Sequence, residues 1–221
     1  PCQIKGLYSF LRNKKYVNLI TMDFLCHGVP SPGVWKRYFE ENFVEERINP
    51  PLAEVGKNFV LKTSLNVNSP IGEVKFRDKF ESGWKKFRFV VRQKSAFKAD
   101  KNIVLLSNIY YDNPYMKGFL SDLYLRPSCY ECRCKNGVSH SDITIGDYWG
   151  VKEVDKELDD DRGLSVVMLN TEKGQEFFSH LKGLRSKQIF LDNAKRLNGG
   201  FSEHTIPHPK RNLFFSVINK K

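Results

Sequence analysis

The sequence lacks several patterns that would assign it to a common class of protein. It has no GxGxxG fingerprint, no second CxxC pair of the kind that zinc ribbons carry, and no internal repeat or low-complexity linker. The longest apolar run, from Val17 to Cys26, contains Asn18 and Asp23 and is too short to span a bilayer. No basic segment followed by an apolar one opens the chain, so secretion has no support. We therefore expect a cytoplasmic protein without a membrane span.

Cysteine is scarce, with five residues among 221. An odd number of cysteines agrees with reduced thiols or metal ligation better than with a disulfide framework. Cys129, Cys132 and Cys134 fall close together, whereas Cys2 and Cys26 are remote in sequence. Cys129 and Cys132 form a CxxC pair, a spacing that lets two thiolates converge on one metal ion or cluster from a tight turn. A tetrathiolate site needs two more ligands, which the other three cysteines can supply.

The charge balance is strongly positive, because 36 lysines and arginines minus 25 acidic residues give +11. This excess favours an anionic partner, such as nucleic acid, anionic lipid, a phosphorylated cofactor or an acidic protein. The basic residues are dispersed, and no helical basic stripe, zinc finger or RNA-recognition signature accompanies them, so nucleic-acid binding is not expected. The hydrophobic fraction of 40% and the charged fraction of 28% are ordinary for a globular protein.

The first part of the chain predicts a helix, a strand, a loop and a second helix. Apolar spacing predicts the first helix from Ile4 to Leu11, which places Cys2 near a helix N-terminus, where the backbone amides favour a thiolate or an anionic ligand. The segment from Val17 to Leu25 has the length and composition of a buried strand. It continues into a turn-rich loop from Cys26 to Gly33 and a helix from about Val34 to about Val44. This order resembles the places where α/β folds bind ligands.

The rest of the chain predicts an α+β fold. Antiparallel strands are expected at three alternating segments, namely Glu73–Asp78, Phe87–Arg92 and Asn102–Leu106. A further buried strand is expected from Gly163 to Leu169. Helices are expected at 115–124, at 171–184 with an N-cap at Asn170 or Thr171, at 193–198 and at 211–219. Residues 1–221 are therefore predicted to form a single α+β domain with a mixed β-sheet and flanking helices.

An isolated CxxC pair also fits a structural zinc knuckle, a redox dithiol or two buried thiols. His27 and His140 could complete a Cys/His zinc site, but His27 follows Cys26 directly, and adjacent residues rarely ligate the same tetrahedral ion. A thioredoxin-type dithiol opens a helix after a strand, whereas the segment from Arg126 to Cys129 is typical of a loop.

Two acids, Asp142 and Asp147, flank the strand after the cysteine loop. They are candidates for the acid and base of a polysaccharide-modifying transferase. As a strand-flanking pair they are more typical of residues that cap turns.

Five segments in order along the chain resemble the motifs of one family. They are Pro1-Cys2-Gln3, Phe24-Leu-Cys-His-Gly-Val-Pro-Ser31, Phe76-Arg-Asp-Lys79, Arg126-Pro-Ser-Cys-Tyr-Glu-Cys132 and Ser141-Asp-Ile-Thr-Ile-Gly-Asp147. The chain is similar to the beta-subunit family of coenzyme F-420 hydrogenases and dehydrogenases, which are flavin and iron-sulfur oxidoreductases. It looks closest to bacterial members associated with surface-polysaccharide genes.

The resemblance implies one 4Fe-4S cluster and one FAD. By position, Cys2, Cys26, Cys129 and Cys132 match the family's cysteines and would hold the cluster, while Cys134 stands where many relatives carry an apolar residue. The residues that we expect at the FAD are two groups of turn residues and two cations, namely Gly28, Ser31, Gly33, Arg77, Lys79, Gly146 and Asp147.

The implied function is electron relay, in which a reduced donor, either a deazaflavin or a ferredoxin-like protein, delivers electrons to the flavin and the cluster exchanges them with a partner. That partner is a redox protein or a ferredoxin-like segment. The alternative is a zinc-stabilised interaction module, or an accessory protein in surface-polysaccharide synthesis, without redox activity. Because the chain begins inside a motif at Pro1, we expect a domain truncated at its N-terminus that folds but is empty of cluster and flavin.

Overall fold

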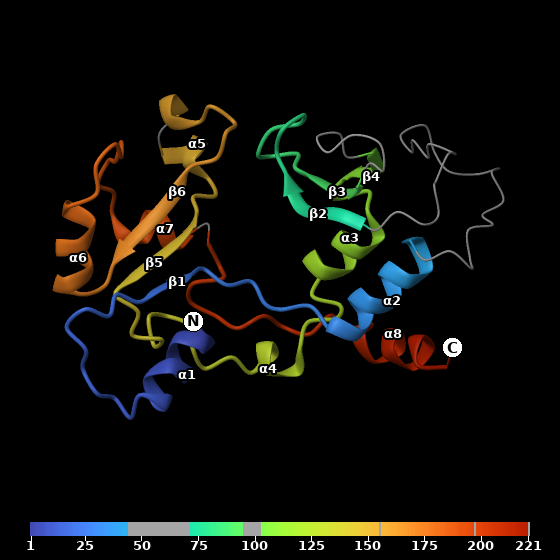
Figure 1. The fold of residues 1–221 in the computed structure, drawn as a ribbon, viewed down its shortest axis with the longest axis horizontal. Helices are drawn as coiled ribbons and strands as arrows, with labels where there is room; N and C mark the ends of the chain where they lie inside the picture. The colour runs from blue at the N-terminus through green and yellow to red at the C-terminus, as the bar shows by residue number, and fades with distance from the viewer. Residues whose placement is uncertain (44–70, 95–102, 155, 197, 221) are drawn as a thin grey trace. The chain divides into compact units, whose positions relative to one another are not determined.

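The computed structural model describes residues 1–43, 71–94, 103–154, 156–196 and 198–220. The chain divides into two compact units (Figure 1). Unit 1 comprises Pro1–Val29 and Arg126–Ile206, and unit 2 comprises Pro30–Leu125 and Pro207–Lys221. All five cysteines belong to unit 1.

Unit 1 is organised around a three-stranded mixed sheet with the order β1-β5-β6. The central strand, β5 (Ile143–Asp147), pairs in parallel with β1 (Met22–Phe24) and antiparallel with β6 (Ser165–Leu169). The other elements of this unit are helices: α1 (Cys2–Phe10), α4 (Pro127–Tyr130), α5 (Val151–Val154), the 3₁₀-helix η2 (Lys156–Leu158), α6 (Glu172–Ser179) and α7 (Leu191–Arg196).

An apolar cluster packs on this sheet. Tyr148, Val151, Val166, Met168 and Ala194 are buried in it, with further partly buried apolar side chains around them. Residues of β6 supply two of these side chains because they alternate between buried and exposed positions along the strand. The Thr171 hydroxyl caps α6 by accepting a hydrogen bond of 3.0 Å from Gly174 N–H, which confirms one of the two predicted caps.

In the part of the chain that the structure describes, unit 2 contains an antiparallel sheet with the order β2-β3-β4 and the helices α2, α3 and α8 (Figure 1). The strands are β2 (Ile71–Asp78), β3 (Arg88–Gln93) and β4 (Ile103–Ile109), and the helices are α2 (Pro32–Phe43), α3 (Pro114–Leu120) and α8 (Arg211–Ile218). The core is rich in aromatic side chains, and Phe89 and Val91 of β3 are fully buried in it. Buried Asn113 begins α3, since its side chain accepts a hydrogen bond from Met116 N–H.

The predicted α+β class is confirmed, and a mixed sheet is present in unit 1. The three predicted antiparallel strands also form, in unit 2. Val44 and Asn102, at the ends of two predicted elements, lie outside the described residues. Within the part of the chain that the structure describes, no helix has the length and apolar character needed to cross a membrane.

The buried strand predicted from Val17 to Leu25 is largely wrong. Only Met22–Phe24 is a strand, and the Val17 side chain is 90% exposed. Within this short strand Met22 and Phe24 are exposed, and the buried residue is Asp23. The strand therefore turns its polar side chain inward, because hydroxyl groups from distant segments satisfy the carboxylate.

The helix predicted from Tyr115 to Tyr124 is shorter than expected. It ends at Leu120, and Asp122 adopts a positive φ of 61°. This left-handed conformation breaks the helical path, and aspartate tolerates it better than most residues. Tyr124 then enters the core from the following loop instead of from the helix.

Candidate functional site

The five free cysteines come from three parts of unit 1. Cys2 is the first residue of α1 and is exposed, and Cys26 lies in the loop after β1. Cys129 lies within the short helix α4, and Cys132 and Cys134 follow it in a loop. All but Cys2 are partly buried.

Electrostatic interactions connect these thiols in space. Burial raises the pKa of Cys26; Lys135 and the chain's amino group oppose the shift, and the nearby thiols Cys129 and Cys2 add to it. Burial likewise raises the pKa of Cys134, with Cys132 and Cys2 adding to the shift. Cys26 therefore lies within electrostatic range of Cys129, and Cys2 lies within range of Cys26 and Cys134, in spite of their remote positions in the sequence.

Backbone hydrogen bonds hold the Cys26 loop against α4. Arg126 N–H donates to the carbonyl of Val29 over 2.8 Å, and Val29 N–H donates to Cys129 Sγ over 3.3 Å. Cys129 N–H closes the turn by donating to the Arg126 carbonyl over 2.9 Å. These bonds fix the position of the Cys129 sulfur beside the Cys26 loop.

A buried lysine, Lys135, lies next to the Cys26 backbone. This residue is only 9% exposed. Its Nζ donates hydrogen bonds to the carbonyls of Cys26 and Gly200, the latter over 2.8 Å. Gly200 must approach closely here, since a Cβ at this position would lie 3.3 Å from the Cys26 carbonyl oxygen. Lys135 therefore ties two distant loops together and brings a positive charge to the thiol region. Sequence reasoning missed it, because a single lysine after Cys134 carries no local signal.

A polar network anchors the strand that follows the cysteine loop. Asp23 is 5% exposed and accepts hydrogen bonds of 2.6 Å from both Ser139 Oγ and Thr144 Oγ1. Asp142 accepts from Thr21 N–H, Thr21 Oγ1 and Thr171 Oγ1 over 2.7–2.9 Å.

The network also fixes the charge of Asp142. Burial opposes ionisation, but the hydrogen bonds from Thr21 and Thr171 and the positive charge of Lys173 outweigh it and lower the pKa of Asp142. The Asp142 carboxylate is thus a structural link between β1, β5 and α6. This role agrees with the capping interpretation better than with a general acid.

The residues predicted at the FAD are divided between the units. Gly28, Gly146 and Asp147 belong to unit 1, and Ser31, Gly33, Arg77 and Lys79 belong to unit 2. Two of them have local packing roles. A Cβ on Gly146 would lie 2.6 Å from Leu25 Cδ1, so glycine makes room there for a core side chain. The Arg77 guanidinium lies over the Phe87 ring, 4.9 Å from its centroid.

The fit of a metal centre can be judged from the spacing of the donors. Among the described residues, no three His, Cys, Asp or Glu side chains gather closely enough to hold one metal ion. A single zinc ion needs sulfurs about 3.8 Å apart, given Zn–S bonds of about 2.3 Å. A 4Fe-4S cluster needs a wider ring, because each thiolate binds a different iron. The described part of the chain thus shows no site for a single ion, and Cys2, Cys26, Cys129 and Cys132 are the four thiolates that a cluster would require.

The fold and the cysteine site thus define a small α+β protein with a thiol-rich loop region. A family described as the C terminus of the coenzyme F420 hydrogenase/dehydrogenase beta subunit matches residues 1–189. The chain belongs to this family, which confirms the resemblance and gives it the coarse role of a redox subunit. No curated protein and no solved structure matches the chain significantly.

Proposed function

We propose that this chain is an electron-relay subunit in which Cys2, Cys26, Cys129 and Cys132 hold one 4Fe-4S cluster. The observation that supports this most is the electrostatic interaction of Cys26 with both Cys2 and Cys129, two cysteines that lie far from it and from each other in the sequence. Four thiolates are the donor set that such a cluster requires. Membership of a family of hydrogenase and dehydrogenase subunits supports the same chemistry.

The proposal extends to an FAD held by Gly28, Ser31, Gly33, Arg77, Lys79, Gly146 and Asp147. The net charge of +11 suits a diphosphate, and Arg77 and Lys79 are exposed cations at the end of β2. When bound, a flavin exchanges electrons in pairs and an iron-sulfur cluster exchanges them singly, which lets the two couple a hydride donor to a one-electron partner. The donor is a deazaflavin or a ferredoxin-like protein, and the acceptor is a redox partner protein.

The chain's own residues prepare the thiol region for this role. Val29 N–H donates to Cys129 Sγ and so fixes the position of this sulfur. Lys135 fixes the Cys26 loop by donating to the Cys26 carbonyl, and its positive charge opposes the rise in the pKa of Cys26. Partial burial of the thiols from Cys26 to Cys134 limits the access of water. Cys134 is outside the proposed ligand set, and it provides a matched control.

The test is iron and sulfide analysis after anaerobic reconstitution of the 221-residue chain. The chain should be empty as purified, and reconstitution, which supplies iron and sulfide, should give about four irons per chain, in keeping with one 4Fe-4S cluster, and visible absorption that dithionite bleaches. Cys129→Ser should remove most of the iron, whereas Cys134→Ser should retain it. Stoichiometric zinc in place of iron would favour the zinc-stabilised module. If Cys134→Ser lowers iron as much as Cys129→Ser does, the proposed ligand set is wrong.

A further inference from the structure

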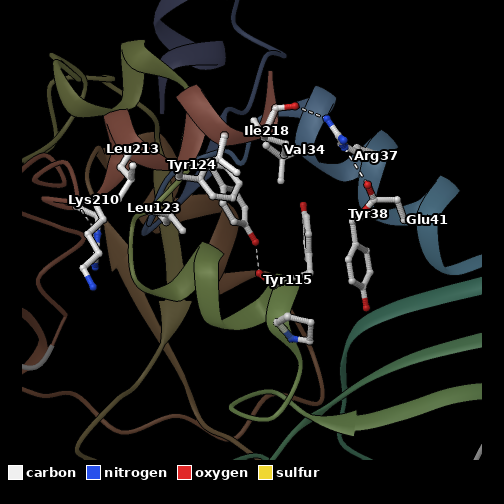
Figure 2. A pocket seen from close by; sticks show the side chains of 14 residues that line it. Val34, Arg37, Tyr38, Glu41, Tyr115, Leu123, Tyr124, Lys210, Leu213 and Ile218 are labelled. Atoms are coloured by element: carbon white, nitrogen blue, oxygen red, sulfur yellow. Dashed lines mark hydrogen bonds and ion pairs between the residues drawn. The ribbon is translucent and has the colours of Figure 1, made fainter. Parts of the chain in front are cut away.

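Unit 2 contains a cavity of about 540 Å³ that the proposed relay does not use (Figure 2). Helices α2, α3 and α8 and the loop after α3 form its walls, with apolar side chains such as Val34, Leu123, Leu213, Val217 and Ile218. This volume is in the range of small-molecule pockets, which are mostly apolar with a few polar groups. None of the residues predicted at the FAD lines the cavity, and α8 lies beyond the residues that the family match covers.

The hydroxyl of Tyr115 faces the cavity. Tyr115 is 4% exposed, and although its backbone carbonyl accepts a hydrogen bond from the Tyr124 hydroxyl, its own hydroxyl has no partner among the described residues. Figure 2 shows the Tyr115 ring with its hydroxyl directed toward Val34 and Ile218. Burial raises the pKa of Tyr115 to about 12, so the hydroxyl is a donor at neutral pH. Because this hydroxyl faces the cavity, a ligand that offers an acceptor can take its hydrogen bond.

The cavity wall carries one ion pair and one further lysine. Arg37 pairs with Glu41 over 2.9 Å and also donates to the Ile218 carbonyl, so this pair brings no net charge. Lys210 has no carboxylate partner in the described part of the chain. Figure 2 shows it at the end of the cavity where Leu123 and Leu213 lie. The cavity therefore carries one uncompensated positive charge at the N-terminal end of α8.

We propose that this cavity binds a compact aromatic anion of one or two fused rings, with Tyr115 donating a hydrogen bond to a ring substituent and Lys210 pairing with the acidic group. Tyr38, Tyr124 and Phe214 line its wall, and aromatic side chains pack well against a planar ring. This binding site is independent of the cluster and of the FAD, so its failure would leave the electron-relay proposal unchanged.

Three related probes separate the two polar contacts. The compound 6-hydroxy-2-naphthoate carries both groups, 2-naphthoate lacks the hydroxyl, and 2-naphthol lacks the carboxylate. Titration calorimetry of each probe with the full chain should give saturable binding to one site, tightest for 6-hydroxy-2-naphthoate. Tyr115→Phe should lower the affinity for 6-hydroxy-2-naphthoate about two- to tenfold and leave the affinity for 2-naphthoate unchanged. Lys210→Gln should lower the affinity for both carboxylate probes by up to about fivefold and leave the affinity for 2-naphthol unchanged.

Two further variants decide whether the cavity itself is the site. Val217→Trp fills the cavity from α8 and should abolish the binding of all three probes. Phe80→Ser removes an apolar side chain that is 94% exposed and does not line the cavity, so it should change none of the affinities. The proposal fails if Phe80→Ser weakens binding as much as Val217→Trp, or if no probe saturates at millimolar concentration. It also fails if sedimentation shows that the wild type is a dimer and that Val217→Trp is a monomer, because a second copy of the chain would then cover the cavity.

Discussion

The two units of this chain are stabilised by different kinds of interior. Unit 2 buries aromatic rings that contact one another, such as Phe89, Tyr115 and Tyr124, over a sheet whose central strand also buries Val90 and Val91. Unit 1 has a small apolar cluster and, beside it, a set of buried polar side chains that includes Asp23 and Asp142. The first interior depends on shape and the second on hydrogen bonding. The two should therefore respond differently to steric and to electrostatic changes.

The largest effect is expected from a steric change in unit 2. A Cβ on Gly118 in α3 would lie 2.3 Å from Tyr124 Cε1, and the Tyr124 ring is nearly fully buried and hydrogen-bonded to the Tyr115 carbonyl. Because the ring cannot move freely, we expect Gly118→Ala to lower the free energy of unfolding by about 3 kcal/mol, at the upper end for overpacking. Urea unfolding followed by circular dichroism measures this change.

A glycine of unit 1 provides the control for that experiment. Gly6 lies within α1, and a Cβ there would have no heavy atom within 4 Å. Gly6→Ala should therefore leave stability unchanged or raise it by up to about 1 kcal/mol, because alanine favours helix. An equal loss of stability in the two variants would show that glycine content, and not the contact with Tyr124, sets the result.

An intermediate effect is expected from an electrostatic change in unit 1. Asp142→Asn replaces a carboxylate that accepts three hydrogen bonds and lies 3.6 Å from Lys173 Nζ. We expect a loss of about 2 kcal/mol at pH 7, since hydrogen bonds to charged groups contribute about 1.5–3 kcal/mol each and asparagine retains part of them. Asp160→Asn, at an exposed ion pair, should have no measurable effect.

The pH dependence of this variant gives a second measurement. The pKa of Asp142 is lowered in the folded state, so its contribution is complete above the ordinary aspartate pKa of about 3.9 and is lost as the pH falls through the lowered folded value. The difference in stability between the wild type and Asp142→Asn should therefore shrink below about pH 4. A difference that stays constant down to pH 2 would mean that the charge of Asp142 does not contribute.

The contrast between the units also explains how much the sequence predicted. The strands of unit 2 were found because apolar and basic residues alternate between Phe87 and Arg92, although Val90 is buried as well as Phe89 and Val91, so that β3 is covered on both faces. The segment from Val17 to Leu25 misled the same reasoning, since its inward-facing residue is Asp23, whose partners Ser139 and Thr144 lie more than a hundred residues away. Long-range hydrogen bonds leave no local pattern in a sequence.

The candidate site shows the same division. The CxxC pair of Cys129 and Cys132 was evident from its spacing, but spacing alone did not connect it with Cys2 or Cys26; only the resemblance to a family did. Lys135 and the hydroxyl of Tyr115 were missed because their importance comes from burial and from missing or distant partners. These are properties of tertiary packing, which hydrophobic periodicity does not predict.

The smallest effect concerns the charge that unit 1 places beside its thiols. Lys135 is buried and donates to the Cys26 carbonyl, so its positive charge should stabilise the more negative, reduced state of a bound cluster. In the reconstituted protein, Lys135→Gln should lower the reduction potential by roughly 40 mV, which for one electron corresponds to about 1 kcal/mol. Lys135→Arg keeps the charge, so its reduction potential should stay close to that of the wild type. Lys14→Gln, at an exposed position, should leave the potential unchanged. A redox titration followed by electron paramagnetic resonance measures the potentials. If Lys135→Gln and Lys135→Arg shift the potential equally, Lys135 acts through the shape of the Cys26 loop, and the polar interior of unit 1 contributes no charge to the site.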